Sequence, residues 1–126
     1  MGTRVLLVED EPANQALVQE TLALASGDSD FQLRVARTLA EARQAVADAS
    51  FDIILLDVRL PDGNGLDLAA ELKASPTTSS TRVLIVSASV LPAERDRALA
   101  TGADGFLAKP FTPSALVASM ESLLRS

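Results

Sequence analysis

The sequence contains no cysteine, no histidine, no tryptophan and no tyrosine. Without cysteine the chain can form no disulfide, thiolate metal site or cysteine nucleophile. Without histidine it has no imidazole for a zinc site or a catalytic triad, and it cannot carry a phosphohistidine. The absence of tryptophan and tyrosine argues against stacking on a flavin or a nucleobase. The available chemistry is that of carboxylates, hydroxyls, two lysines and nine arginines.

The length of 126 residues suits one domain over 1–126, and 48% of the residues are apolar, which is enough for a packed core. The formal net charge of −6 disfavours direct binding to nucleic acid or to an anionic membrane. No apolar run approaches the roughly 18 residues of a membrane span, and the N-terminal region has no signal-peptide pattern. We therefore expect a cytoplasmic protein.

Four short runs are apolar at consecutive positions, which is typical of strands buried on both faces of a parallel sheet. They lie at residues 5–8, 53–56, 83–86 and, more weakly, 106–108. A fifth segment, residues 31–35, alternates apolar and polar side chains. That alternation favours an edge strand with one face in water.

Segments with helical spacing lie between these runs. Pro12 suits the first turn of a helix that reaches about residue 25, and its expected inner face carries Ala13, Leu17 and Leu24. Thr38 is a predicted N-cap, with Glu41 three residues later completing a capping box. The expected inner stripe of that helix is Leu39, Ala42, Val46 and Ala49.

Three further helices are predicted at residues 66–74, 92–100 and 113–124, and Gly102 would follow the second of these in a left-handed conformation. A strand followed by a helix thus occurs five times. This alternation predicts an α/β fold with a doubly wound, five-stranded parallel sheet and helices on both faces. The chain is too short for the eight units of a barrel, so we predict strand order 2-1-3-4-5.

Polar side chains follow the predicted strands at their carboxyl ends, where open parallel sheets bind ligands. Glu9 and Asp10 follow the first strand, and Asp57 follows the third. Ser87 ends the fourth strand and Lys109 follows the fifth. Taken singly, the acidic pair can be a helix cap and Lys109 a surface lysine, whereas Asp57 after four apolar residues is costly unless it is paired or metal-bound. The predicted fold brings them all to one edge.

Clustered carboxylates repel one another and need a cation, and an all-oxygen site suits Mg²⁺ or Mn²⁺. A carboxylate is also a covalent acceptor of phosphoryl groups. Transfer to it requires in-line positioning and neutralisation of the phosphoryl oxygens. Mg²⁺ and the ammonium of Lys109 can neutralise these oxygens, and the hydroxyl of Ser87 can donate a hydrogen bond to one.

Five motifs carry a resemblance to a known family: VEDEP at 8–12, ILLDVRLPDGNG at 54–65, VSA at 86–88, GAD at 102–104 and KPF at 109–111. In this order and spacing they resemble the receiver domain of bacterial two-component response regulators, over residues 5–124. The resemblance implies a flavodoxin-like (receiver) fold. It also implies a phosphoprotein that acts in signal transduction.

The resemblance implies a role for each residue at the strand ends. Asp57 is similar to the family's phosphoacceptor, and Lys109 to the lysine that contacts the phosphoryl group. Asp10 is similar to a direct metal ligand and Glu9 to one that acts through water. Asp57 and the backbone carbonyl of Arg59 would complete the metal site.

The family's two-state switch would use Ser87 and Phe106. The phosphoryl group draws in the hydroxyl, and the aromatic ring turns inward to fill the space. The change alters the face formed by the helix at 92–100, the strand at 106–108 and the helix at 113–124. Many members have tyrosine at the position of Phe106, and plain core packing is the alternative interpretation of this residue.

Two positions beside the site, Arg59 and Ser89, lie two residues after the acceptor and the switch hydroxyl. Amide or carboxylate side chains there help to position the attacking water, which Arg and Ser do poorly. We therefore expect slow loss of the phosphoryl group. The resemblance also implies a cis peptide before Pro110.

Because the chain has no histidine, its phosphoryl donor must be another molecule. The resemblance implies a sensor histidine kinase or a phosphotransfer protein, with a small-molecule donor as a further source. We expect a downstream protein partner and no catalysis beyond the chain's own phosphorylation and slow dephosphorylation. Members that dimerise through this face usually carry opposed charges on both helices, and the last helix here offers only Glu121 and Arg125. We therefore expect a monomer. A stand-alone regulator and a module of a hybrid kinase or larger regulator both fit.

Three alternatives have weaker support. An aspartyl-phosphate phosphatase on a similar fold needs a second aspartate two residues after the nucleophile, where this chain has Arg59. A flavodoxin-like cofactor binder needs a phosphate loop after the first strand, but the acidic segment 9–12 repels phosphate. A pseudo-receiver that only docks partners has no need of the complete set of acceptor-site residues.

Overall fold

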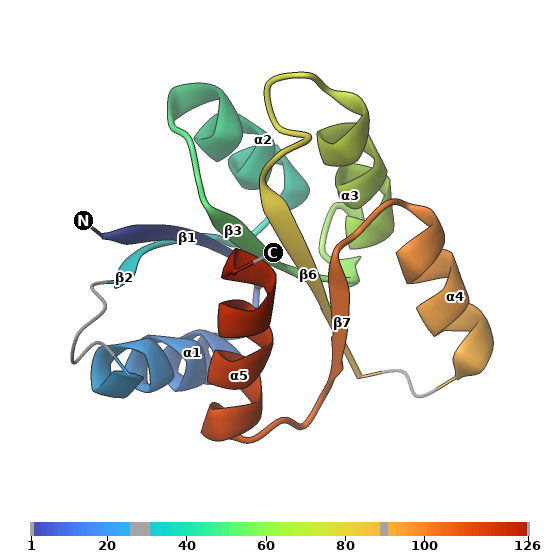
Figure 1. Cartoon of the computed structure of the whole chain (residues 1–126). Helices are drawn as coiled ribbons and strands as arrows, with labels where there is room; N and C mark the ends of the chain where they lie inside the picture. The colour runs from blue at the N-terminus through green and yellow to red at the C-terminus, as the bar shows by residue number, and fades with distance from the viewer. Residues whose placement is uncertain (1, 26–30, 89–90, 126) are drawn as a thin grey trace.

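Five parallel strands form the central sheet of the protein, whose computed structural model describes residues 2–25, 31–88 and 91–125 (Figure 1). They are β1 (Thr3–Val8), β2 (Phe31–Ala36), β3 (Ile53–Asp57), β6 (Arg82–Ser87) and β7 (Gly105–Ala108). Their order in the sheet is β2-β1-β3-β6-β7. Because β6 and β7 are the fourth and fifth strands of this sheet along the chain, the predicted order 2-1-3-4-5 is confirmed.

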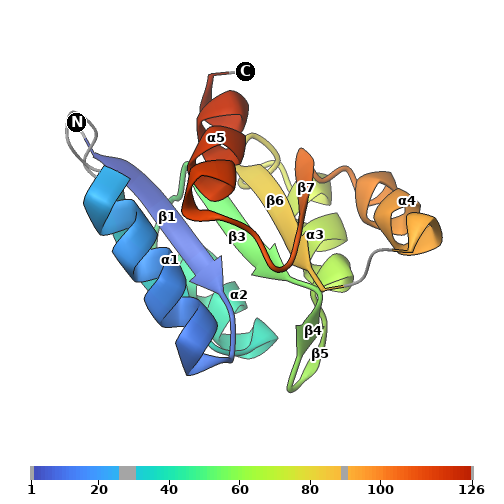
Figure 2. The same cartoon turned by 90° about the horizontal axis from the view of Figure 1, so that it is seen from below.

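Helices cover both faces of the sheet, as the strand–helix alternation predicts. One face carries α1 (Pro12–Ala25) and α5 (Pro113–Leu124). The other face carries α2 (Leu39–Asp48), α3 (Gly65–Ala74) and α4 (Pro92–Ala100) (Figure 2). Within the described ranges, every helix falls short of the length and apolarity that crossing a membrane requires.

The consecutive apolar residues of the strands are explained by these two helical layers. In β1, Leu6 and Val8 pack in the core on the α2–α3 side, and Val5 and Leu7 pack in the core on the α1–α5 side. Successive side chains of a strand point to opposite faces, so both sets must be apolar. The edge strand β2 instead alternates half-buried and exposed side chains, and only Ala36 in it is buried.

The inner face predicted for α1 is wrong. Leu24 is 88% exposed, Ala13 is exposed and Leu17 is only half-buried. The apolar residues that the helix buries are Val18 and Leu22. These two are four residues apart, so they form a stripe on a different side of the helix from the one predicted.

The rotation of α1 is explained by a buried glutamine. The side-chain Nε2 of Gln15 donates a hydrogen bond of 2.8 Å to the backbone carbonyl of Glu9, at the end of β1. Gln15 shares a helix face with Val18 and Leu22, at spacings of three and four residues. Because a buried amide needs a partner, this bond favours the rotation that buries Val18 and Leu22. An apolar pattern alone does not reveal a polar residue that faces inward.

A short hairpin after β3 has no counterpart in the sequence prediction. It pairs β4 (Arg59–Leu60) with β5 (Gly63–Asn64). At its turn, the carboxylate of Asp62 accepts hydrogen bonds from the backbone N–H groups of Leu39 (2.8 Å) and Ala40 (3.1 Å). The hairpin is thereby tied to the N-terminus of α2. Strands of two residues are too short to show a periodic pattern.

The helix ends follow the predicted signals with one difference. Thr38 caps α2, since its hydroxyl accepts from the backbone N–H of Glu41 at 3.0 Å. The Glu41 carboxylate accepts from the backbone N–H of Arg37 (3.4 Å), one residue earlier than a capping box requires. Gly102 follows α4 with a φ of +91°, as predicted. The buried residues of α2 are Leu39, Ala42 and Ala45, and Val46 and Ala49 are half-buried against the same core.

Candidate functional site

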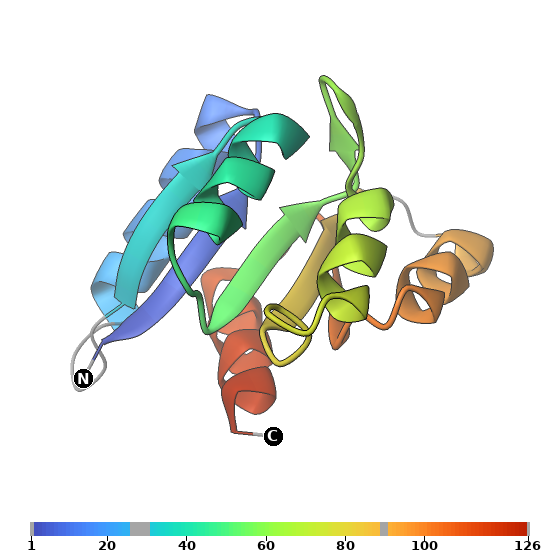
Figure 3. The same cartoon turned by 90° about the horizontal axis from the view of Figure 1, so that it is seen from above.

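The carboxyl ends of the sheet strands open on one edge of the molecule, from which the β4–β5 hairpin projects (Figures 2 and 3). Glu9 and Asp10 directly follow β1, and Asp57 ends β3. Ser87 ends β6, and Lys109 directly follows β7. A cleft at this edge is lined by Asp10, Glu11, Asn14, Asp57, Arg59, Leu60, Pro61, Ser87, Ala88, Leu91 and Lys109.

Three carboxylates converge beside this cleft. Glu9, Asp10 and Asp57 each have an oxygen within 4.8 Å of an oxygen of the other two. Glu9 is only 3% exposed, and the other two residues are half-buried. Negative charges this close repel one another strongly where water is partly excluded. The cluster therefore needs positive charge nearby.

Lys109 provides part of that positive charge. Its Nζ lies 2.7 Å from Oε1 of Glu9 and 3.3 Å from Oδ2 of Asp57. The backbone N–H of Lys109 donates to the carbonyl of Ser87 at 2.8 Å, and the following peptide, to Pro110, is cis, as the resemblance implies. The three carboxylates therefore carry more negative charge than this one ammonium balances.

The surroundings change the proton affinities of Asp57 and Lys109. Burial, reinforced by the negative charge of Glu9, raises the pKa of Asp57 from 3.8 to about 6, although Lys109 opposes the rise. For Lys109, burial acts to lower the pKa. The hydrogen bond to Glu9 and the charges of Asp57 and Glu9 outweigh it, so the pKa of Lys109 lies above its ordinary value. Lys109 is therefore a cation at neutral pH.

Glu9 is held in place from both its backbone and its side chain. Gln15 donates to its backbone carbonyl, and the backbone N–H of Glu11 donates to Oε2 at 3.2 Å. The other carboxylate oxygen, Oε1, binds Lys109. Glu9 therefore fixes the position of the ammonium relative to Asp57. The role of Gln15 was not predicted from the sequence, because its inward orientation depends on this tertiary contact.

The chain packs tightly around the backbone of Asp57. The N–H of Gly65 donates to the carbonyl of Val58 at 2.6 Å. A Cβ atom at residue 65 would overlap the carbonyl oxygen of Asp57, so the position requires glycine. The hairpin between Asp57 and Gly65 begins with Arg59, which lies exposed beside the cleft. Gly65 was part of the motif at 54–65. Its close approach to Asp57 could not be predicted from that motif, because it depends on how α3 folds back on β3.

Ser87 and Phe106 lie on the same side of the sheet. Ser87 is 3% exposed, and its hydroxyl donates to Oε1 of Glu94 at 3.3 Å. Phe106 is half-buried, packs against the core on the α2–α3 side and pairs in the sheet with Ile85, two residues before Ser87. Phe106 does not line the cleft. Ser89, the second position predicted to affect the lifetime of the phosphoryl group, lies outside the described residues.

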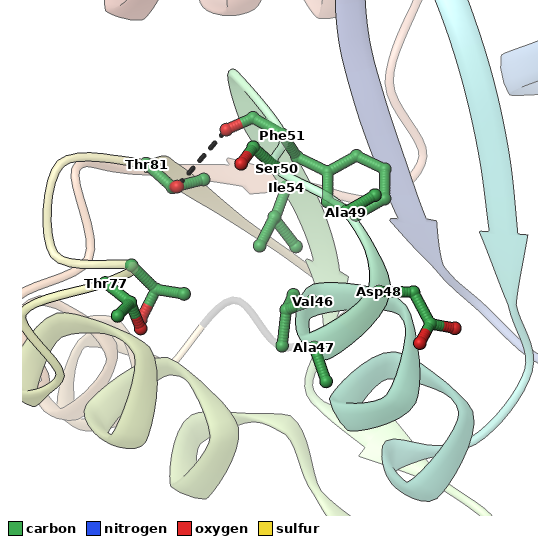
Figure 4. Close-up of a pocket in the computed structure, with 10 residues that line it drawn as sticks. Val46, Ala47, Asp48, Ala49, Ser50, Phe51, Ile54, Thr77 and Thr81 are labelled. Atoms are coloured by element: carbon green, nitrogen blue, oxygen red, sulfur yellow. Dashed lines mark hydrogen bonds between the residues drawn. The ribbon is translucent and has the colours of Figure 1, made fainter.

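A second hollow lies at the opposite edge of the sheet, between the end of α2, the start of β3 and the loop before β6 (Figure 4). The hydroxyl of Thr81 donates to the carbonyl of Phe51 there at 3.2 Å. Its one carboxylate, Asp48, accepts from Gln44 (2.8 Å) and pairs with Arg34 (3.6 Å). The hollow therefore lacks the clustered charges of the cleft at the carboxyl edge.

The residues at the carboxyl edge fit a hard divalent cation. The donor atoms offered by Glu9, Asp10 and Asp57 are all carboxylate oxygens, the ligand type that Mg²⁺ and Mn²⁺ take in proteins. The charge balance is in accord with this, because the three carboxylates outnumber the ammonium that pairs with two of them. The half-burial of Asp10 and Asp57 leaves room for the waters that Mg²⁺ retains.

The fold and the cleft define a flavodoxin-like α/β protein with a carboxylate–lysine site at the carboxyl edge of its sheet. The family model for the response regulator receiver domain matches residues 5–121. The chain therefore belongs to the response regulator receiver domain family, as its motifs implied. This membership connects the chain with two-component signalling.

Relatives with known roles include two phosphate regulon transcriptional regulatory proteins named PhoB. The protein from Pseudomonas aeruginosa is 31% identical, and the one from Escherichia coli strain K12 is 34% identical, each over 99% of this chain. The matched region is 53% of each relative. The chain thus spans about half the length of the curated relatives it matches.

Solved structures show the same fold. The chemotaxis response regulator CheY4 of Vibrio cholerae superposes with a TM-score of 0.88 at 26% identity, covering 98% of this chain and 99% of that one. The receiver domain of a sensor histidine kinase from Pseudomonas aeruginosa also gives 0.88 at 26% identity, with both chains fully covered. That second structure has a magnesium ion coordinated in its active site cleft.

Proposed function

We propose that the chain is the phosphoacceptor switch of a two-component or phosphorelay system. In this function Asp57 takes a phosphoryl group from the phosphohistidine of a partner, either a sensor histidine kinase or a phosphotransfer protein. Slow hydrolysis then returns Asp57 to the free carboxylate. The chain has no further catalytic activity.

One observation carries this proposal: a single ammonium bridges two carboxylates, and a third carboxylate lies beside them. Lys109 contacts Glu9 and Asp57 at 2.7 and 3.3 Å, and Asp10 completes the cluster. A phosphoryl acceptor needs an anionic oxygen next to groups that neutralise incoming oxygens. Asp57 supplies that oxygen at the mouth of a cleft, and Lys109 supplies a positive charge.

The chemical step is a displacement at phosphorus. A carboxylate oxygen of Asp57 forms a bond to phosphorus as the bond to the imidazole nitrogen of the donor breaks, and the imidazole leaves with the electron pair and takes up a proton. The pKa of Asp57 is about 6, so the carboxylate is mostly ionised, and hence nucleophilic, at pH 7. Negative charge then lies on the phosphoryl oxygens rather than on the carboxylate, and the ammonium of Lys109 pairs with one of these oxygens.

Asp10, Asp57 and the backbone carbonyl of Arg59 would hold Mg²⁺, or Mn²⁺ in its place, with Glu9 acting through water. When bound, the ion would supply positive charge to the phosphoryl oxygens. Glu9 also holds the ammonium of Lys109 on one side of Asp57. The hairpin carries Arg59, and the bonds from α2 to Asp62 hold that hairpin in place.

The output is a change in the face made by α4, β7 and α5. Ser87 turns its hydroxyl to the phosphoryl group, and Phe106 on the neighbouring strand moves inward. Both residues lie on the side of the sheet that carries α4. The net charge of −6 supports a protein partner rather than direct contact with nucleic acid.

The direct test is intact mass spectrometry after incubation with Mg²⁺ and acetyl phosphate. We expect the mass of one added phosphoryl group on the parent chain. The adduct should be absent from Asp57→Asn and from the parent in EDTA. Asp96→Asn, an exposed aspartate on α4, is the matched control and should be phosphorylated like the parent.

Two results would count against the proposal. An adduct that persists in Asp57→Asn would place the acceptor elsewhere. The lack of any adduct on the parent, from acetyl phosphate and from phosphohistidine donors with rapid sampling, would favour a docking module without phosphorylation.

A further inference from the structure

The hydroxyl of Ser87 is engaged by a carboxylate from a neighbouring helix. Its Oγ donates to Oε1 of Glu94 at 3.3 Å, in a partly buried setting. Ser87 shares its side of the sheet with Ile85, which packs in the same core as Ala98 of α4. The bond therefore joins the end of β6 to the helix that covers it.

Glu94 differs from the other charged residues of its helix. It is half-buried, and it shares the inner face of α4 with the buried Ala98 four residues later. The remaining charged residues of this helix point to solvent: Arg95, Asp96 and Arg97. The position of Glu94 thus directs its carboxylate to the sheet, where Ser87 ends β6.

Little buried surface holds α4 on the sheet. Of the nine residues of α4, all of them described, only Ala98 is buried, and the N-cap residue makes no side-chain capping bond. An element with so little buried apolar surface moves easily relative to the sheet. A hydrogen bond from the sheet to the first turn of such a helix therefore influences the position of the helix.

We propose that Glu94 is a positioning residue that holds the Ser87 hydroxyl in the unphosphorylated protein and gives it up to the phosphoryl group. This inference rests on the proposed phosphoacceptor function of Asp57. A serine hydroxyl has one proton to donate, so it cannot serve Glu94 and a phosphoryl oxygen at once. The more highly charged phosphoryl group wins this competition. The first turn of α4 then loses its bond to β6, and the state of Asp57 is transmitted to α4.

Competition for one proton has a measurable consequence. An acceptor that must be displaced lowers the affinity for whatever displaces it. Replacing Glu94 should therefore strengthen binding of a phosphoryl mimic. At 3.3 Å the bond is longer than the usual O–H···O distance, so we expect tighter binding by about threefold to tenfold rather than more.

The experiment is a titration with beryllofluoride, a phosphoryl mimic, in the presence of Mg²⁺. Binding is followed by fluorine NMR, because the chain has no tryptophan to report it. The variants are Glu94→Ala, Ser87→Ala and the double variant, with Asp96→Ala as the exposed control on the same helix. Thermal unfolding of each variant checks that it is folded. The amide chemical shifts of α4, recorded by NMR on isotopically nitrogen-labelled protein, report the position of the helix.

We expect Glu94→Ala to bind more tightly than the parent and Asp96→Ala to match the parent. In the Ser87→Ala background, Glu94→Ala should have no effect, a result that a purely structural role would not produce. The inference is overturned if Glu94→Ala matches the parent, or if its effect persists without the serine hydroxyl. If the parent protein neither binds beryllofluoride nor accepts a phosphoryl group, the proposed function is overturned. The inference that Glu94 releases Ser87 is then overturned as well.

Discussion

Replacing Asp57 with asparagine should stabilise the metal-free protein. The half-buried side chain of Asp57 is 14% exposed, and its carboxylate faces Glu9 across the same ammonium. Asparagine keeps the shape of the side chain and removes the negative charge. In the absence of a divalent cation, the variant therefore avoids an electrostatic penalty that the parent carries at neutral pH.

The size of this effect follows from the pKa of Asp57, which rises from 3.8 to about 6 on folding. Below pH 3.8 the carboxyl is protonated in both states, so the folded protein carries no penalty. Between pH 3.8 and 6 the unfolded chain releases its proton more readily, so folding loses stability as the pH rises. Above pH 6 the loss of stability is complete. The difference between the two pKa values corresponds to about 3 kcal/mol. Because solvent screens a half-buried charge, we expect about 1–2 kcal/mol.

Urea unfolding in EDTA measures this difference. At pH 7 we expect Asp57→Asn to be more stable than the parent by about 1–2 kcal/mol, and the advantage should shrink towards pH 4. Mg²⁺ should stabilise the parent more than the variant, because it binds only the folded carboxylate cluster. Asp96→Asn controls for a general effect of net charge. A variant no more stable than the parent at pH 7, or an advantage unchanged at pH 4, would refute the reasoning.

Two further predictions concern α1 and the lifetime of the phosphoryl group. Leu22→Ala should lower the free energy of unfolding by about 2–4 kcal/mol, whereas Leu24→Ala should change it by less than about 0.5 kcal/mol; equal effects in urea unfolding would contradict the observed rotation of the helix. Arg59→Asn should lose its phosphoryl group about twofold to fivefold faster than the parent, the range of an exposed charge interaction. A lifetime equal to or longer than that of the parent, measured by intact mass after the donor is removed, would contradict the expectation that Arg59 slows loss of the phosphoryl group.

Much of the fold was predictable because the sheet is buried on both faces. Such strands must be apolar at every position, so the runs at 5–8, 53–56 and 83–86 stand out from the helices between them. Helix ends were predictable for a similar reason, since Thr38 and Gly102 act through local backbone geometry. Once strand and helix alternate, few topologies remain for a chain of this length.

Errors arose where a polar contact or a very short element decided the structure. Gln15 faces inward to reach the carbonyl of Glu9, and that bond favours the side of α1 that buries Val18 and Leu22. The β4–β5 hairpin depends on Asp62 reaching α2, 22 and 23 residues away in the chain. Periodicity reports which residues are apolar, but it does not report which distant atoms a side chain contacts.

The sequence by itself determined the fold class, the strand order and the residue types at each strand end, because burial and local geometry act along the chain. It also determined family membership, through the order and spacing of its motifs. Only the tertiary structure decided that Lys109 lies between Glu9 and Asp57, that burial raises the pKa of Asp57 and that Ser87 is held by Glu94. These properties depend on distances between atoms far apart in the chain, and those distances exist only after the strands have paired and the helices have packed on them.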